Sequence, residues 1–387
     1  MSGVAIVLQL GCKANLRTQV PAVLSQADDF PIHQNPEPIA YAGASRNFYD
    51  RYFFNGYHLE EDVFFALGMG LYPQLDIIDA GFSFIIDGVQ HNLLCSRILN
   101  HERMNTQVGA ITVEVVKPLQ CLRIVIDAPE HGLKADLLFD GRAPAQEEPR
   151  FTRRIGAQTM MDYTRLTQNG NWQGWIEFKS RKIEVSPELW LGTRDRSWGI
   201  RPVGLPDAQP NPQAPDINQF YWLWAPINWP DGVSLYHLND DADGKPWNTA
   251  GMFIPLIGEA RPMRRVSSEI EFISGTRHAK SALITLQGFD GSVAEISMRP
   301  RFHWYMKGVG YGHSNFGHGH YHGGDAQLFE EYALADVDDA LNLHIQAICD
   351  VTMEGDLGRH SGRGVLEQLI LGPHAPSGFT ELLDMAP

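Results

Sequence analysis

Basic residues are scarce in this chain of 387 residues. It carries 31 Lys and Arg against 46 Asp and Glu, a formal net charge of −15, and no run of Lys or Arg offsets that charge. A surplus of this sign repels nucleic acids and anionic membrane surfaces. We therefore expect no nucleic-acid partner, and the composition favours a hydrophobic small-molecule ligand.

Cysteine is scarce too, with four scattered residues: Cys12, Cys95, Cys121 and Cys349. They form no CxxC pair, which argues against a zinc ribbon and gives no disulfide framework. Reduced thiols in the cytoplasm are the simplest interpretation of this pattern.

Long apolar runs and the short motifs of several enzyme classes are absent. The apolar run in MSGVAIVLQLGCK is too short for a membrane span and follows no basic region, so we expect neither a signal peptide nor an integral membrane segment. Its LGC resembles part of a lipobox, but the basic start of a lipoprotein is missing. The chain has no P-loop, no GxGxxG after a strand, no GxSxG and no HExxH. We expect no cofactor.

Strand signals dominate what is present. Short segments rich in β-branched and aromatic residues end on turn residues in both halves of the chain. The predicted strands lie at 64–72, 80–88, 109–117, 122–128, 133–141, 172–180 and 182–186, and then at 219–228, 232–240, 250–258, 267–275, 281–291, 293–306 and 341–354.

Turns, loops and a few short helices connect these strands. Asn-Gly and Asp-Gly pairs, such as Asn169-Gly170, predict hairpin turns because glycine supplies the positive φ that such turns need. The proline-rich segment 202–215 predicts a long loop. Only 156–166 and 325–339 show a weak helical character.

Two successive blocks of strands predict an all-β protein built from two antiparallel barrels or sandwiches in tandem. We expect an N-terminal segment at 1–45, a first barrel at 46–190 and a second at 191–387. The sequence leaves a homodimer open.

The densest polar cluster is GTRDRSWGIRP. If it is extended, Arg194, Arg196 and Trp198 share one face, while Asp195 and Ser197 occupy the other. A carboxyl group that points into an apolar cavity has a raised pKa, as a general acid at neutral pH requires. The alternative is a structural network of arginines and aspartate at the domain junction.

Histidine is concentrated in YGHSNFGHGHYHGGD, residues 311–325. His318, His320 and His322 alternate, and such pairs can bind Zn²⁺ or Fe²⁺. However, Asp325 is the only adjacent carboxylate, so we assign no metal. A pocket-lining role as proton relay and ordinary loop packing remain as alternatives.

Aromatic residues are dense in the second block, and packing in the core is their default role. One alternating set is free to line a cavity for an apolar ligand. His237 and His303 lie on predicted strands with aromatic neighbours, where a histidine is often part of the core. The aromatic residues concerned are Phe220, Tyr221, Trp222, Trp224, Trp229, Trp247, Trp304 and Tyr305.

Four stretches together resemble the tandem lipocalin-like (calycin) superfamily of carotenoid hydratases, also called hydroxyneurosporene synthases, and AttH-like proteins. They are FALGMGLYPQLDIIDAGFSFIIDG, RDRSWGIR, YGHSNFGHGHYHGG and GRGVLEQLILGP. The resemblance covers roughly 45–380 and is strongest to a bacterial branch. It implies two lipocalin-like β-barrels, few helices and a ligand pocket near their interface.

The resemblance also implies chemistry on terpenoid- or steroid-like molecules without a redox cofactor. It predicts a hydratase or dehydratase (a hydro-lyase, which is a carbon–oxygen lyase) or an isomerase, and a non-catalytic lipocalin-like binding protein is the alternative. The residues predicted to act on the substrate are Asp195, His303, His318 and His320. Those predicted to shape its cavity are Trp198, Trp222, Trp224, Tyr236, His237 and Tyr311, and Arg194, Arg196 and Arg201 are expected to brace the domain junction.

Overall fold

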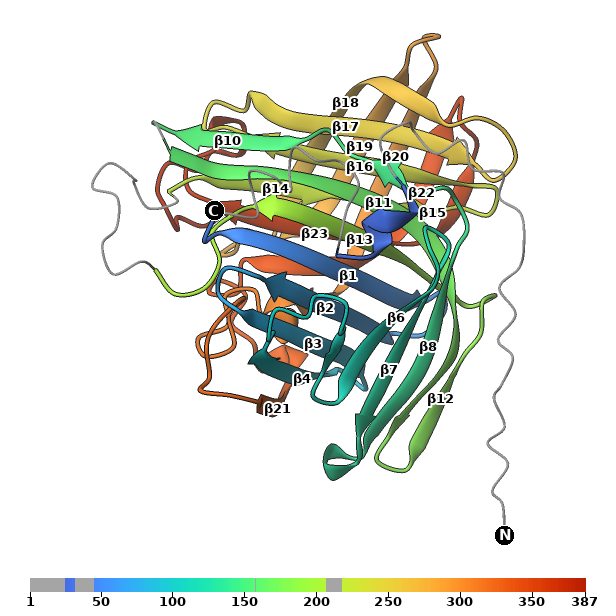
Figure 1. The fold of residues 1–387 in the computed structure, drawn as a ribbon. Helices are drawn as coiled ribbons and strands as arrows, with labels where there is room; N and C mark the ends of the chain where they lie inside the picture. Colours follow the sequence, from blue (N-terminus) through green and yellow to red (C-terminus); the bar gives the residue numbers. More distant parts are fainter. Residues whose placement is uncertain (1–24, 32–44, 157, 207–217) are drawn as a thin grey trace.

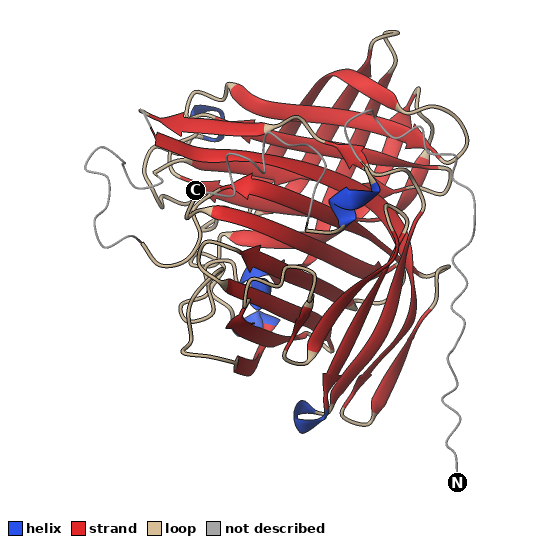
Figure 2. Ribbon diagram, in the orientation of Figure 1, coloured by secondary structure: helices blue, strands red, loops and turns tan. Residues whose placement is uncertain are grey.

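The computed structural model describes residues 25–31, 45–156, 158–206 and 218–387, and in these residues it is an all-β protein of two sheets (Figures 1 and 2). Regular α-helix is absent from the described part of the chain, and the helical turns are short 3-10 segments. These are η1 (Gln26–Asp29), η2 (Pro129–His131), η3 (Met306–Val309), η4 (Leu334–Asp336) and η5 (Ala375–Ser377). The predicted fold class is confirmed.

Sheet A is a curved, antiparallel half-barrel. Its main path runs β21-β4-β3-β2-β1-β13-β11-β8-β7-β6-β5, and β9, β10 and β12 pair with β11 off that path. The strands are β1 (Phe48–His58), β2 (Phe64–Tyr72), β3 (Ile77–Ile86), β4 (Val89–Ile98), β5 (Gln107–Val108), β6 (Ile111–Lys117), β7 (Cys121–Ala128), β8 (Leu133–Gly141), β9 (Gln146–Glu147), β10 (Phe151–Ile155), β11 (Gln158–Phe178), β12 (Arg181–Val185), β13 (Trp190–Ile200) and β21 (Ala326–Ala333).

Sheet B is a closed barrel. Its path runs β14-β23-β22-β20-β19-β18-β17-β16-β15, and an additional pairing of β14 with β16 closes it. The strands are β14 (Phe220–Trp224), β15 (Ile227–Asn228), β16 (Gly232–Asp240), β17 (Pro246–Pro255), β18 (Arg261–Phe272), β19 (Ala279–Gly288), β20 (Val293–Tyr305), β22 (His344–Gly355) and β23 (His360–Leu371).

Strand β1 is buried along its whole length because apolar residues cover both of its faces. Tyr52 and Phe54 belong to the core of sheet A. Phe53 points the other way into a cluster shared with sheet B, where its ring lies 6.4 Å from that of Trp224 and 6.2 Å from that of Trp304. The two sheets are therefore held together by an aromatic interface.

Both predicted helices are wrong. The segment 156–166 contributes the first part of β11, which pairs with β13 from Asp162 onward. The segment 325–339 contains β21, which pairs with β4 over its full length and so extends sheet A with a strand from the second half of the chain. Pairing with β10 and β13 in the first case, and with the distant strand β4 in the second, outweighs a weak local preference.

The predicted turn at Asn169-Gly170 is also wrong, because both residues lie inside the 21-residue strand β11. A side chain at Gly170 would meet the ring of Phe139 at 2.3 Å and the carbonyl oxygen of Asp140 at 2.6 Å. Glycine here permits the close approach of strand β8.

The predicted boundary at 190/191 falls at the first residues of β13, which pairs with β1 and β11 in sheet A. Sheet A thus continues to Ile200 before the chain enters sheet B. Most of the predicted N-terminal segment 1–45 and of the predicted loop 202–215 lies outside the described residues.

Two of the cysteines, Cys95 and Cys349, are free and buried, whereas Cys121 is disulfide-bonded. Cys12 lies outside the described residues. A location in the reducing cytoplasm stays a prediction. In the described residues, no helix has the length and apolarity that a membrane crossing requires.

Candidate active site

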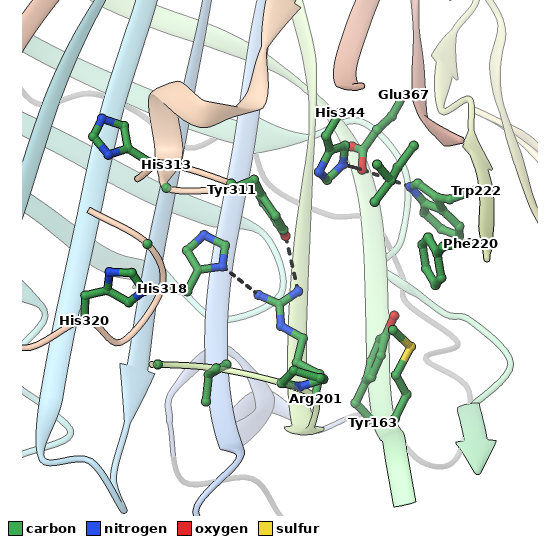
Figure 3. A pocket seen from close by; sticks show the side chains of 18 of the residues that line it. Tyr163, Arg201, Phe220, Trp222, Tyr311, His313, His318, His320, His344 and Glu367 are labelled. Atoms are coloured by element: carbon green, nitrogen blue, oxygen red, sulfur yellow. Dashed lines mark hydrogen bonds and ion pairs between the residues drawn. The ribbon is translucent and has the colours of Figure 1, made fainter. Parts of the chain in front are cut away.

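A pocket of about 380 Å³ lies where both sheets meet the histidine-glycine loop, which we define as residues 310–325 (Figure 3). Sheet A supplies residues of β11, and sheet B supplies residues of β14, β22 and β23. Its principal side chains are Tyr163, Arg165, Arg201, Phe220, Trp222, Tyr311, His318, His344 and Glu367. The pocket therefore combines aromatic walls with several charged groups.

Arg201 and His318 form one side of the pocket. The guanidinium of Arg201 lies over the ring of Tyr49, 4.2 Å from its centre, and contacts the hydroxyl of Tyr311 at 3.3 Å. His318 lies against Arg201 and Arg51, and its Nε2 is 3.0 Å from the carbonyl oxygen of Val309. Burial and the two arginines lower the pKa of His318 well below its ordinary value, so the ring stays neutral.

His344 and Glu367 form a pair on the opposite side (Figure 3). Nε2 of His344 lies 3.0 Å from Oε1 of Glu367, and Glu367 also accepts hydrogen bonds from Trp222 (2.9 Å) and Gln346 (2.8 Å). Burial opposes ionisation of Glu367, but these hydrogen bonds outweigh it and lower the pKa. Glu367 is thus an anion that orients a histidine at the pocket wall.

Arg165 connects the pocket to a second buried carboxylate. Its guanidinium donates to Glu148 (Nε–Oε2 2.7 Å) and lies 4.7 Å from the ring centre of Trp222 and 5.3 Å from that of Trp224. Thr167 donates to the other oxygen of Glu148 at 2.6 Å. Aromatic rings and a carboxylate together hold this arginine in place.

Asp195 lies beside this group on the face of β13 that is turned toward sheet B. It is directly opposite Phe53 of β1 and Thr167 of β11, and directly opposite residues share one face of a sheet. Burial raises the pKa of Asp195 to about 7, Arg165 opposes the shift, and Glu367 adds to it. Asp195 does not itself line the pocket, but Arg165 and Glu367 do.

The opposite face of β13 carries the two arginines that precede and follow Asp195. Arg194 is fully buried and pairs with Asp29 (2.5 Å), and Arg196 is fully buried against Asp50 and over the ring of Tyr52. This is the alternation expected from the sequence. Both arginines brace sheet A rather than the junction between the sheets.

The structure brings five of the predicted site residues to the pocket wall and leaves the others elsewhere. Trp224 packs beside Arg165, and His237 lies behind Trp222 with its Nδ1 3.6 Å from Glu148. Tyr236 is in the core of sheet B, Trp198 is in a small cluster on the far face of β13, and His303 lies near His278 and Asp339. Those at the pocket wall are Trp222, Arg201, Tyr311, His318 and His320.

The histidines of this loop each make their own contacts and do not converge on one point. Nδ1 of His313 accepts backbone N–H groups from Asn315 and Phe316, His320 contacts the carbonyl oxygen of Asn315, and His322 stacks on Phe316. Together with His318 between two arginines, they make no shared ligand set within the described part of the loop.

Three residues that matter here carry no signal in the local sequence. His344 and Glu367 lie in ordinary strand sequence, 23 positions apart, and meet only because β22 pairs with β23. Asp79 of β3 accepts the backbone N–H of Gly319 at 2.7 Å and so anchors the loop, and burial raises the pKa of its carboxyl group to about 6.

Solved structures share this fold. An AttH-like protein of Nitrosomonas europaea aligns with a TM-score of 0.52 at 14% identity, over 88% of this chain and 98% of its own. Kievitone hydratase from Nectria haematococca (TM-score 0.47, 9% identity, 91% and 94% covered) and CghA with Sch210972 (0.48, 11%, 85% and 89%) align more loosely. The predicted resemblance to AttH-like proteins is confirmed for the fold.

None of the curated proteins matches the sequence. The sequence profile of one family, described as a family of unknown function (DUF8625), matches residues 24–380. That range includes both sheets and every residue of the pocket. The chain therefore belongs to this family of unknown function.

Proposed function

We propose that the protein is a cofactor-independent hydratase or dehydratase, or an isomerase, that transfers protons to and from a hydrophobic terpenoid- or steroid-like molecule in the pocket between the sheets. The pocket volume of about 380 Å³ suits a small ligand. Phe220, Trp222 and Tyr163 would contact its apolar body.

One observation carries this proposal: two carboxyl groups near one pocket, buried Glu367 and partly buried Asp195, have pKa values shifted in opposite directions. Asp195 has a pKa of about 7, while that of Glu367 is lowered. The charge of Glu367 also raises the pKa of Asp195. Such a divergent pair is the usual arrangement of an acid and a base in one active site.

In the proposed hydration, protonated Asp195 gives its proton to one carbon of a carbon–carbon double bond. The π electron pair forms the new C–H bond, and the neighbouring carbon becomes a cation, which the face of Trp222 would stabilise. A water molecule forms the C–O bond with its lone pair. Its excess proton passes to His344, held by Glu367, and returns through water to Asp195.

Dehydration is the reverse sequence. If the cation loses a proton from another carbon before water adds, the same groups give an isomer with a shifted double bond. In both cases the protons lost and gained balance, and no electrons leave the substrate.

The test is incubation of the full chain with a panel of terpenoid alkenes and alcohols in D₂O, with carbon-bound deuterium in the product measured by mass spectrometry. Asp195→Asn should reduce incorporation about 100-fold or more, the typical contribution of a general acid. The matched control is Asp162→Asn, which alters a partly exposed aspartate of β11, the strand next to β13, where it pairs with Arg150. Wild-type turnover by Asp195→Asn would refute the assignment.

The alternative is a lipocalin-like carrier that binds an apolar ligand without changing it, and one observation favours it. Asp195 is not among the residues that line the pocket. Native mass spectrometry of freshly purified protein separates the two functions. A retained apolar ligand that the protein leaves unaltered in D₂O would support carriage and contradict catalysis.

A further inference from the structure

A second group of histidines and a carboxylate lies outside the pocket, at one end of the sheet B barrel. His278 precedes β19, His303 is on β20, and Asp339 is in the segment between η4 and β22. One ligand atom from each of the three residues lies within 4.8 Å of the other two. Within the described residues, none of the three lines the pocket between the sheets.

Nδ1 of His278 makes no hydrogen bond of good geometry. The side chain is fully buried, and its Nε2 lies 2.9 Å from the carbonyl oxygen of Asn342. Because a carbonyl oxygen can only accept, Nε2 donates to it, and Nδ1 is the ring nitrogen that faces the carboxylate of Asp339. A metal ion between Nδ1 and that carboxylate would bind both groups.

The distances suit a metal ion at that position. Nδ1 of His278 is 3.4 Å and Nδ1 of His303 is 3.6 Å from Oδ1 of Asp339. Metal–ligand bonds of about 2.0–2.2 Å in tetrahedral geometry separate neighbouring ligand atoms by about 3.3–3.6 Å. Both measured separations lie within this range of ligand–ligand distances, and they are long for direct hydrogen bonds.

Outer contacts already hold two of the three side chains in place. The hydroxyl of Tyr305 donates to Asp339 at 2.5 Å, and the carbonyl of Asn342 fixes the orientation of His278. Such partners set the tautomer and the angle of metal ligands.

A groove of about 410 Å³ gives access to the site, and His303, Tyr305 and Asp339 line it. The two cations on its wall are neutralised, because Lys280 pairs with Glu271, and Arg301 pairs with Asp62 and Asp350. Three protein ligands and an open side leave a fourth position for water or a ligand.

We propose that His278, His303 and Asp339 bind one divalent transition-metal ion, of which Zn²⁺ is the best fit. Two imidazoles and one carboxylate favour late first-row ions over Mg²⁺ and Ca²⁺, which prefer oxygen ligands. The inference is independent of the proposed function, since the two sites share no lining residue among those described.

The test uses the full chain without a histidine tag, stripped with chelator and titrated with ZnCl₂ by calorimetry. We expect one equivalent of Zn²⁺ to bind, and a Co²⁺ titration to give the visible absorption of a tetrahedral centre. Asp339→Asn and His303→Gln should each weaken binding at least tenfold. Both residues are only partly buried, so these variants should fold even if His278→Asn does not.

The matched control is the double variant His320→Gln/His322→Gln, which removes two histidines of the histidine-glycine loop and should leave Zn²⁺ affinity unchanged. Absence of stoichiometric Zn²⁺ binding by the wild type would overturn the proposal and leave an ordinary histidine–carboxylate network. Binding that survives Asp339→Asn and His303→Gln but is lost in the loop double variant would overturn it as well.

Discussion

The two faces of β13 differ in whether a charged side chain has a close partner of opposite charge. On the face toward the core of sheet A, Arg194 and Arg196 are each matched by a buried aspartate. On the face toward sheet B, Asp195 has no equally close partner among the residues that the structure describes, and burial raises its pKa to about 7. Neighbouring residues of one strand therefore serve stability on one side and, in our proposal, chemistry on the other.

This difference teaches where to expect pH dependence. A closely paired charge is held ionised by its partner, and disrupting the pair costs stability at any ordinary pH. A buried acid without such a partner keeps its proton instead, so its contribution changes with pH. The variants below test the contrast.

Arg194→Met should have the largest effect. It leaves the buried carboxylate of Asp29 without its cation, and removing one partner of a buried pair costs about 3–5 kcal/mol. The free energy of unfolding, measured by urea denaturation, should fall by that amount.

The double variant Arg194→Met/Asp29→Leu is the control for this prediction, since it removes both charges. It should recover most of the lost stability. If Arg194→Met alone loses less than about 1 kcal/mol, the pair is not the brace that its burial indicates.

Asp195→Asn should remove one contribution to the pH dependence of the free energy of unfolding. An unfolded aspartate ionises near pH 4, whereas folded Asp195 keeps its proton to about pH 7. The stabilising contribution of this raised pKa is complete below about pH 4, decreases as the pH rises and is lost above about pH 7. Relative to the wild type, the variant should therefore gain stability as the pH rises from about 4 to about 7, by as much as about 4 kcal/mol.

Urea denaturation of both proteins at several pH values measures this difference directly. Asp79, whose pKa is also raised, remains in both proteins and cancels in the comparison. A stability difference that does not change with pH would contradict the raised pKa of Asp195.

His318→Asn should change stability with the opposite dependence on pH, and the change should be smaller than that of Asp195→Asn. The unfolded histidine gains a proton below about pH 6.5, whereas folded His318 stays neutral between its arginines. The wild type therefore loses stability as the pH falls, by about 1 kcal/mol over the first unit below that value, and the variant should not share this loss. Thermal unfolding at about pH 5.5 and pH 7.5 would reveal it, and equal losses in both proteins would contradict it.

Asp162→Asn should have the smallest effect. Its pair with Arg150 is half-exposed on both sides, and such pairs contribute about 0–1 kcal/mol. Urea denaturation should give a change of about 0.5 kcal/mol or less. A larger loss would show that even surface pairs on this sheet brace it, which would weaken the contrast between the faces of β13.

Much of this contrast could be predicted from the sequence. Alternation along RDRSW placed Asp195 opposite its two arginines, because side chains of a strand point to alternate faces whatever the fold. Segments with dense β-branched and aromatic residues, such as β2 and β8, were predicted with their observed bounds.

What the sequence could not show depends on pairing between distant strands. Nothing local in AQLFEEYA indicates β21, whose conformation is set by strand β4 more than 230 residues earlier. Clustering in the sequence also misled: the histidines of the histidine-glycine loop act separately, whereas His278, His303 and Asp339 come from three separate segments and meet. Side chains converge through topology, which short motifs do not encode.

The place of β21 at the edge of sheet A has a consequence for synthesis on the ribosome. Strands β1 to β13 emerge first, but β4 keeps an open row of backbone N–H and C=O groups until Ala333 has been made. An exposed edge of this kind pairs readily with other chains. A fragment that stops after Ile200 would therefore be prone to aggregate. Expression of sheet A requires the chain at least as far as the end of β21.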